Sequence, residues 1–281
     1  MHIPDGFLST PVWLALDAAA APAVVVAARM ARRELEETRV PLLGVMGAFV
    51  FAAQMINFPV SAGTSAHLVG GALLAIALGP ASAMVVMTAI LSLQAFVFLD
   101  GGVVALGANV LNMAIAGVVA GYLPYHFWGR RRLAYFAGGV LSVLVSALLA
   151  LTELLVSGVP LPRPALAVTL GLFAMNALAE GAITAAVLEG IYRLNAGFIR
   201  PAQGMRPRTL AVVGLAAALL AAVGVLVAST HPDGIEQLLH HAPGLLDAPW
   251  FRKTAEGLAG VAAIFVLTVL AGRLIARRRT A

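Results

Sequence analysis

The first two residues of the chain, Met1 and His2, offer three nitrogen atoms that can bind one metal ion. These are the α-amino nitrogen of Met1, the main-chain amide nitrogen of His2 and a ring nitrogen of His2, which close adjacent chelate rings. A second imidazole would complete a planar set of four nitrogens, the geometry expected of Ni(II) or Cu(II). The opening MHIPDGFLST has no basic region and no small-residue cleavage site, so we expect no signal peptide to be removed and the amine to stay free.

The fourth nitrogen is expected from His67, which ends the segment NFPVSAGTSAH. Asn, Pro, Gly, Ser and Thr favour turns, so this segment is predicted to be a shaped loop rather than a regular element. The alternative is that His67 lies at the start of a helix that Thr64 or Ser65 caps. The two interpretations are compatible.

The elements that position these residues must be membrane helices, because the composition excludes a soluble fold. Of the 281 residues, 61% are hydrophobic and only 11% are charged, and the mean hydropathy is +0.95. Soluble domains are nearer 45–50% apolar and about 25% charged. The chain has no cysteine, which excludes disulfides, thiolate metal sites and cysteine nucleophiles. Any bound metal must use nitrogen or oxygen ligands.

Apolar stretches of about 20 residues, the length that crosses a bilayer as a helix, predict an all-α, polytopic membrane helix bundle of about nine transmembrane segments. The third segment is short and ends at Gly79-Pro80, so it is either a half-span or continuous with the fourth. The expected segments are approximately 10–29, 40–58, 66–79, 80–98, 105–124, 134–157, 165–190, 209–229 and 255–272.

The distribution of basic residues predicts the orientation of this bundle. Threading the segments back and forth leaves only Arg163, Arg252 and Lys253, out of 18 Lys and Arg residues, on the face that carries the N-terminus. Because basic loops remain cytoplasmic, we expect the N-terminus outside and the C-terminus in the cytoplasm. The net charge of +5 therefore belongs to one membrane face and does not indicate nucleic acid.

The same threading brings most histidines and several acids to the outer side, including a cluster in the segment STHPDGIEQLLHHAP. Imidazole and carboxylate groups both suit divalent metal ions, so this segment is predicted to help load metal into the N-terminal site. The alternative is a turn at Pro-Asp-Gly followed by a capped helix with solvated histidines. The cluster consists of His231, Asp233, Glu236, His240 and His241.

Four acids fall within the expected spans, where a charge costs about 2.5 kcal/mol or more at mid-bilayer. Glu153 and Glu189 lie near span ends and are expected to pair or to reach the interface, Glu189 beside Arg193. Asp17 and Glu180 lie deeper, and the sequence indicates only that they make contacts within the bundle.

Three motifs together resemble the CbiM/NikM family, the substrate-binding membrane subunits of energy-coupling-factor transporters for cobalt and nickel. They are MHIPDGFLS, NFPVSAGTSAHLVGG and LQAFVFLDGGVVALGANVLNMA, and they occur in order from the N-terminus. The resemblance implies that Met1, His2 and His67 hold the metal near the outer surface. It also implies residues that orient these ligands, for which the candidates are Asn57, Ser65, Gln94 and Asp100.

A second resemblance covers the C-terminal part of the chain. Two expected spans flank HPDGIE, which looks like a PDGLE-type domain related to CbiN, a two-span accessory subunit, with Ile235 in place of the usual Leu. We therefore predict two parts, a CbiM/NikM-like metal-binding core at 1–200 and a fused accessory domain at 201–281. The linker between them, YRLNAGFIRPAQGMRPR, is rich in Arg, Pro and Gly.

These resemblances predict a transporter component that captures Ni²⁺ or Co²⁺ outside and delivers it inward, with nickel slightly favoured. The chain contains no phosphate-binding G-x-x-x-x-G-K-[ST] loop, so ATP hydrolysis would come from cytoplasmic ATPase subunits acting through a transmembrane coupling subunit. It also lacks His-Glu-x-x-His and Gly-x-Ser-x-Gly, so we expect no enzyme and no resident cofactor. The expected location is the cell inner membrane. The alternative function is an ion-coupled or passive metal carrier that works without ATPase partners.

Overall fold

The protein is described by a computed structural model. The structure describes residues 1–35, 39–56, 58–61, 64–194, 207–227, 235 and 250–277. Within these residues the chain is a helix bundle with one small two-stranded antiparallel hairpin.

The helices follow the apolar segments of the sequence closely. Each of the nine expected segments contains helix within the described part of the chain, and every boundary is shifted by only a few residues except around the hairpin. The α-helices are α1 (Thr10–Glu34), α2 (Val40–Gln54), α3 (Gly71–Leu78), α4 (Pro80–Leu93), α5 (Leu106–Asn109), α6 (Val118–Trp128), α7 (Arg132–Val156), α8 (Arg163–Leu194), α9 (Pro207–Val227) and α11 (Trp250–Arg277). Two π-helical stretches, η2 (Gln94–Phe98) and η3 (Val110–Gly117), continue α4 and α5.

Five helical stretches within the described residues are long and apolar enough to cross a membrane. They are Thr10–Arg33, Pro80–Phe98, Leu106–Trp128, Arg132–Val156 and Arg163–Leu194. Large apolar side chains such as Leu14, Val26 and Leu170 are exposed on these helices, as expected of surfaces that face lipid. The chain is therefore a multi-pass membrane protein, while the number of spans and the orientation of the termini remain predictions.

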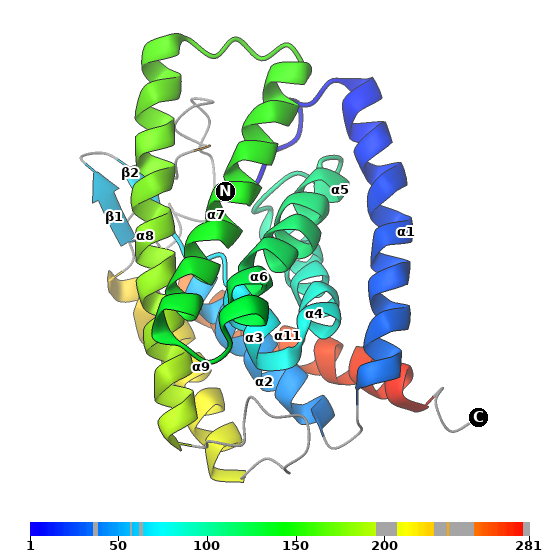
Figure 1. The fold of residues 1–281 in the computed structure, drawn as a ribbon, viewed down its shortest axis with the longest axis vertical. Coiled ribbons are helices and arrows are strands. Elements are labelled where there is room, and N and C mark those ends of the chain that lie inside the picture. The colour runs from blue at the N-terminus through cyan, green and yellow to red at the C-terminus, as the bar shows by residue number, and fades with distance from the viewer. Residues whose placement is uncertain are drawn as a thin grey trace.

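Figure 1 shows α1, α7 and α8 standing lengthwise around the shorter helices. The N-terminal segment does not stay at the edge of the bundle. It turns back from the start of α1, so that the label of the N-terminus lies well inside the outline of the molecule. This arrangement follows from residues 1–9, which remain non-helical until Ser9 and Pro11 begin α1.

The third apolar segment differs from its expected extent. Only Gly71–Leu78 is helical, and the helix stops at Gly79, whose φ of 89° ends the helical geometry. Between the second and third expected spans, where we predicted an irregular loop, the chain forms the hairpin β1 (Phe58–Ser61) and β2 (Thr64–Ala66). A helix of eight residues is about 12 Å long, so α3 is a half-span rather than a crossing.

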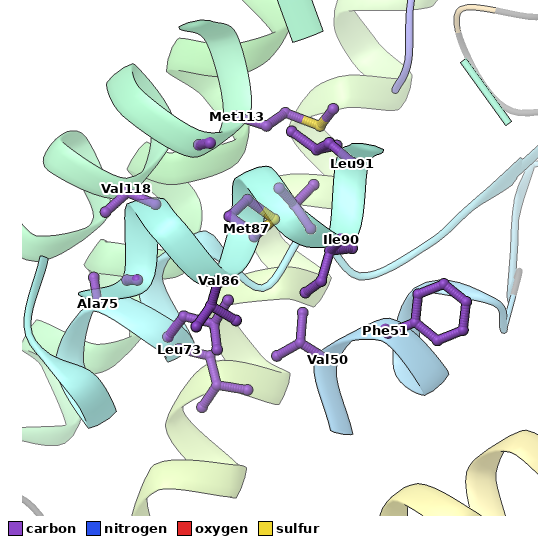
Figure 2. Packing of buried hydrophobic residues seen from close by; sticks show 14 of the residues in the cluster. Val50, Phe51, Leu73, Ala75, Val86, Met87, Ile90, Leu91, Met113 and Val118 are labelled. Atoms are coloured by element: carbon purple, nitrogen blue, oxygen red, sulfur yellow. The ribbon is translucent and has the colours of Figure 1, made fainter. Parts of the chain in front are cut away.

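The core forms around this short helix. All eight residues of α3 are buried, and the side chains of α2, α4, η3 and α6 pack around it (Figure 2). Val50 and Phe51 from α2 and Met113 from η3 have at most 1% of their surface exposed. Because a half-span buried on all sides cannot send its terminal peptide groups to water, its two ends need partners from the protein.

α11 packs against α2 through contacts that require glycine. A Cβ atom on Gly44 would lie 2.6 Å from Cγ2 of Val269, and one on Gly260 would lie 2.3 Å from Cε1 of Phe51. α11 therefore reaches the backbone of α2 as closely as small residues allow, which is how helices associate in lipid. Gly117 and Gly121 likewise lie against Ser146 and Ala72, so this small-residue face serves packing.

Candidate metal site

The α-amino group of Met1 and the His67 ring meet inside the bundle. The Met1 nitrogen lies 3.0 Å from Nε2 of His67, although 66 residues separate them in the chain. Both residues are buried, with 5% and 6% of their surfaces exposed. On the other side of the ring, Nδ1 of His67 lies 2.9 Å from the carbonyl oxygen of Leu68. A carbonyl can only accept, so Nδ1 carries the ring proton and the lone pair of Nε2 points at the amine.

The His2 ring completes the group of nitrogens. It stacks against the ring of His67, with the centroids 5.5 Å apart and the planes inclined by only 8°. His2 is 5% exposed, yet among the described residues neither of its ring nitrogens has a hydrogen-bond partner of good geometry. Buried polar atoms are rarely left in this state, so the two nitrogens mark a position where a ligand would be stabilised.

Asp100 lies at the mouth of this site. Its Oδ1 is 3.1 Å from Nδ1 of His2, and about half of its side chain, 47%, remains exposed. Partial burial raises the pKa of Asp100, but the charge and close contact of His2, together with the charges of His67 and the amine, outweigh it and hold the pKa below its usual range. Asp100 thus places a negative charge beside the nitrogen atoms.

The N-terminal segment is fixed by paired main-chain contacts. The amide nitrogen of Ile3 donates to Oδ1 of Asn109 at 2.8 Å, and Nδ2 of Asn109 donates back to the Ile3 carbonyl at 3.1 Å. The Gly102 amide donates to the same carbonyl at 2.9 Å. Two residues later, the carboxylate of Asp5 accepts the amides of residues 103–105 at 2.8–3.2 Å. His2 is therefore followed directly by residues that cannot shift without breaking several hydrogen bonds.

The segment that receives the N-terminus has an unusual backbone. Leu99 has a φ of 54° and Gly101 a φ of 94°, in the region that glycine adopts most easily. A Cβ atom on Gly101 would lie 3.0 Å from Cβ of His2, and one on Gly102 would overlap the carboxylate of Asp5. The sequence LDGGV supplies the glycines that let residues 99–103 close over residues 2–5.

The loop that carries His67 is held by two buried side chains. Nε2 of Gln54, at the end of α2, donates to the Val69 carbonyl at 2.7 Å, and Oε1 of Gln54 accepts from Nε2 of Gln94 at 3.0 Å. The carboxylate of Glu180 accepts the amides of Val69 and Gly70, each at 2.7 Å. Gln94, a sequence candidate, thus acts on the loop through Gln54, which the sequence did not single out.

The structure locates the other sequence candidates less completely. Ser65 is on β2, in register with Pro59, and Asn57 lies outside the described residues. The alternative that Thr64 or Ser65 caps a helix beside His67 is wrong, because both lie on β2 and α3 begins only at Gly71 with Gly70 at its N-cap. The proposed loading cluster of His231, Asp233, Glu236, His240 and His241 also lies outside the described residues.

The acids within the spans all have partners. Oδ1 of Asp17 accepts the Gly107 amide at 2.8 Å, and Oε2 of Glu153 accepts Nδ2 of Asn112 at 2.7 Å. Glu189 pairs with Arg132 at 3.0 Å and with Arg193 at 3.3 Å, as expected for an acid near the end of a span. None of these contacts involves the nitrogen site.

Side chains alone do not reveal the site. Among the described residues, no group of three or more His, Asp or Glu side chains is placed to hold a metal ion. The site emerges only when the terminal amine and a main-chain amide are counted with His2 and His67. Two of the four candidate donor nitrogens are therefore main-chain atoms and not side-chain atoms.

A family model described as the cobalt uptake substrate-specific transmembrane region, CbiM, matches residues 2–198. The chain belongs to the CbiM family. The match includes His2 and His67, and it ends between α8 and α9. The resemblance that the N-terminal motifs indicated is confirmed.

Named relatives are similar to this chain over about 70% of its length. A fused nickel transport protein NikMN of Rhodobacter capsulatus is 34% identical over 223 residues, covering 72% of this chain and 64% of that protein. A cobalt transport protein CbiM of Thermosediminibacter oceani is 31% identical over 213 residues, covering 71% and 86%. A crystal structure of a truncated transition metal transporter shares 32% identity and a TM-score of 0.61, covering 70% of this chain and 99% of that one.

Proposed function

We propose that this CbiM-family protein captures Ni²⁺ or Co²⁺ at the outer face of the cell inner membrane through four nitrogen atoms. These are the Met1 amine, the His2 amide nitrogen, Nδ1 of His2 and Nε2 of His67. Among the two ring nitrogens of His2, only Nδ1 can close a six-membered chelate ring with the amide of its own residue. The metal therefore replaces the contact between Nδ1 and Asp100, and the Asp100 carboxylate remains nearby as a compensating charge.

The observation that carries this proposal is the 3.0 Å approach of the Met1 amine to Nε2 of His67 within a buried site. An amine and an imidazole nitrogen at this distance share one proton at most, so a metal ion can take the place of that proton between them. The stacked, unsatisfied ring of His2 supplies the next donor. Burial favours an ordered ligand set, since the ligands have little freedom left to lose on binding.

The donor set favours nickel over cobalt. Four nitrogens in a plane suit Ni(II), and Co(II) is bound more weakly in the general order of divalent affinities. Cu(II) would bind more tightly still, so the supply of metal contributes to selectivity. Relatives named for nickel and relatives named for cobalt both align with this chain.

Transport would be driven by partner subunits. The chain has no phosphate-binding loop, so cytoplasmic ATPase subunits acting through a transmembrane coupling subunit would supply the energy. We assign residues 1–200 to the metal-binding core and residues 201–281 to a CbiN-like accessory domain. In that domain, the histidines and acids of 231–241 would deliver metal to the N-terminal site.

Uptake of nickel and cobalt into vesicles tests this function. Vesicles that contain this chain with its coupling and ATPase partners should accumulate metal only when ATP is present. Vesicles that contain this chain alone should bind metal but not accumulate it. Full uptake by the chain alone, driven by a proton gradient, would instead establish the ion-coupled carrier.

A further inference from the structure

Glu180 is a completely buried carboxylate that contacts the loop of His67. Its side chain has no exposed surface, and its two oxygens accept the amides of Val69 and Gly70, each at 2.7 Å. These amides lie two and three residues after His67 and directly before α3. In the part of the chain that the structure describes, no bond to a basic side chain accompanies these two contacts, so the carboxylate holds the main chain of the loop.

The half-span explains why a carboxylate is needed at this point. The first amides of a helix have no acceptors within the helix, and α3 begins inside the bundle, away from water. A negative group at a helix N-terminus also interacts favourably with the helix dipole. Gly70 at the N-cap has no side chain, so Glu180, from a distant part of the sequence, supplies an acceptor for the N-cap amide and another for the amide of Val69 before it.

Close packing between α7 and α8 fixes the position of Glu180 in the bundle. A Cβ atom on Gly139 of α7 would lie 2.8 Å from the carbonyl oxygen of Glu180, and one on Gly181 would lie 2.7 Å from the carbonyl of Phe136. α8 is thus seated against the backbone of α7 at Glu180 itself. The carboxylate therefore comes from a rigid support and not from a movable side of the bundle.

The same face of α8 also touches the other half of the site. Asn176 lies one helical turn before Glu180 and is buried, with 3% of its surface exposed. Its Nδ2 lies 3.5 Å from Sδ of Met1. One helix face therefore contacts the residue that carries the amine and the loop that carries the imidazole.

We propose that Glu180 is a positioning residue for the metal site, which holds the His67 loop so that Nε2 meets the Met1 amine. Val69 is fixed on both sides, its amide by Glu180 and its carbonyl by Gln54. The Leu68–Val69 peptide, whose carbonyl oxygen contacts Nδ1 of His67, thereby has one orientation. This role rests on the proposed function, because it concerns the ligand that the function requires.

Glu180→Gln tests the role with little change in shape. The amide oxygen of Gln can accept one of the two main-chain N–H groups, but its NH₂ group faces the other as a second donor. Loss of a group that orients a ligand typically lowers metal affinity about 10- to 100-fold. We expect such a loss for nickel in titration of the purified full-length protein. We also expect a shifted visible absorption of the bound nickel, because the position of the His67 ligand changes.

Glu153→Gln is the matched control. Glu153 is also a helix acid, but the bond that its carboxylate makes within the described residues comes from the side-chain amide of Asn112 and not from the His67 loop. Glu153→Gln should bind nickel with an affinity within about twofold of the wild type and with an unchanged absorption spectrum. The positioning role is overturned if Glu180→Gln keeps both the affinity and the spectrum of the wild type, or if both variants lose affinity equally.

Two further variants keep the result decisive. If Glu180→Gln does not fold, Glu180→Asp is used, since it keeps the charge but is one methylene too short to reach both amides. Wild-type nickel affinity in that variant would overturn the positioning role.

His67→Ala separates the positioning role of Glu180 from the proposed metal site. Wild-type binding by His67→Ala refutes the metal site itself, whereas lost binding in His67→Ala with retained binding in Glu180→Gln refutes only the role of Glu180.

Discussion

The N-terminal site and the C-terminal helices are held in the bundle by different kinds of contact. Residues 1–5 are fixed by hydrogen bonds that reach across the chain, from Ile3 to Asn109 and from Asp5 to residues 103–105. α11 is fixed to α2 by apolar contact at Gly44, Gly47 and Gly260. Hydrogen bonds specify direction and distance, whereas close packing specifies only proximity. The difference indicates that precision is concentrated where the metal would bind.

The largest effect is expected from removing the imidazole that meets the amine. His67→Ala should lower nickel affinity by roughly 100-fold or more, because metal binding of about 10–16 kcal/mol divides into about 3 kcal/mol for each of four ligands. Titration of the purified protein measures this loss. His126→Ala, in α6 and distant in sequence from both ligands, should bind as the wild type does. Equal losses in the two variants would contradict the assignment of His67.

A smaller loss is expected when the loop over His2 is crowded. Gly101→Ala places a methyl group 3.0 Å from Cβ of His2 at a φ of 94°, and strain of this kind costs on the order of 1–2 kcal/mol. Nickel affinity should fall about tenfold. Gly158→Ala introduces similar strain at a φ of 82° with no neighbour within 4 Å, so it separates crowding from strain. If both variants bind nickel equally well, the close contact between residue 101 and His2 does not contribute to nickel affinity.

The C-terminal packing should respond in stability and not in metal affinity. Gly44→Leu forces a side chain into Val269 and Phe265, and overpacking of this kind costs about 1–3 kcal/mol. Thermal unfolding in detergent should occur at a lower Tm, while the folded fraction binds nickel normally. Gly214→Leu, in α9 with no atom within 4 Å of the added Cβ, should leave the Tm near its original value. A loss of nickel affinity in Gly44→Leu alone would show that the two regions are coupled.

The smallest effect is expected from the half-exposed carboxylate beside His2. Asp100→Asn removes a charge that is worth about 0.5–1 kcal/mol at such a site, so nickel affinity should fall about two- to fivefold. Competition with a chromogenic chelator resolves a change of this size. A loss as large as that of His67→Ala would instead identify Asp100 as a direct ligand.

The sequence predicts most of the fold because the membrane imposes simple rules. Apolar stretches of the right length become helices, and Gly79-Pro80 ends α3 as expected. The strands at 58–61 and 64–66 were not predicted, because the Pro, Gly, Ser and Thr residues of this segment indicate turns rather than strands. Whether a short apolar stretch crosses the membrane or stops halfway depends on partners that local sequence does not contain.

The proposed ligands were predictable from the sequence, and the residues that hold their segments in place were not. Met1, His2 and His67 follow from nitrogen chemistry and from the motif at the start of the chain. Three side chains bind main-chain groups elsewhere in the sequence. Asn109 bonds to a residue 106 positions away, Gln54 to one 15 positions away and Glu180 to one 110 positions away. Nothing in their own neighbourhood indicates this contact. A deep acid such as Glu180 signals only that some partner exists.

The central claim is that the Met1 amine itself binds the metal, and insertion of Leu-Pro between Met1 and His2 tests it most directly. This change keeps every side chain but moves the amine, and because the inserted proline has no N–H, the displaced amine cannot form a continuous chelate with the His2 amide and ring. The same insertion in the loop between α7 and α8 is the control. The four-nitrogen site predicts that nickel and cobalt binding falls to the level of His67→Ala in the first variant and is retained in the second. Undiminished binding of both metals after insertion before His2 would contradict the account.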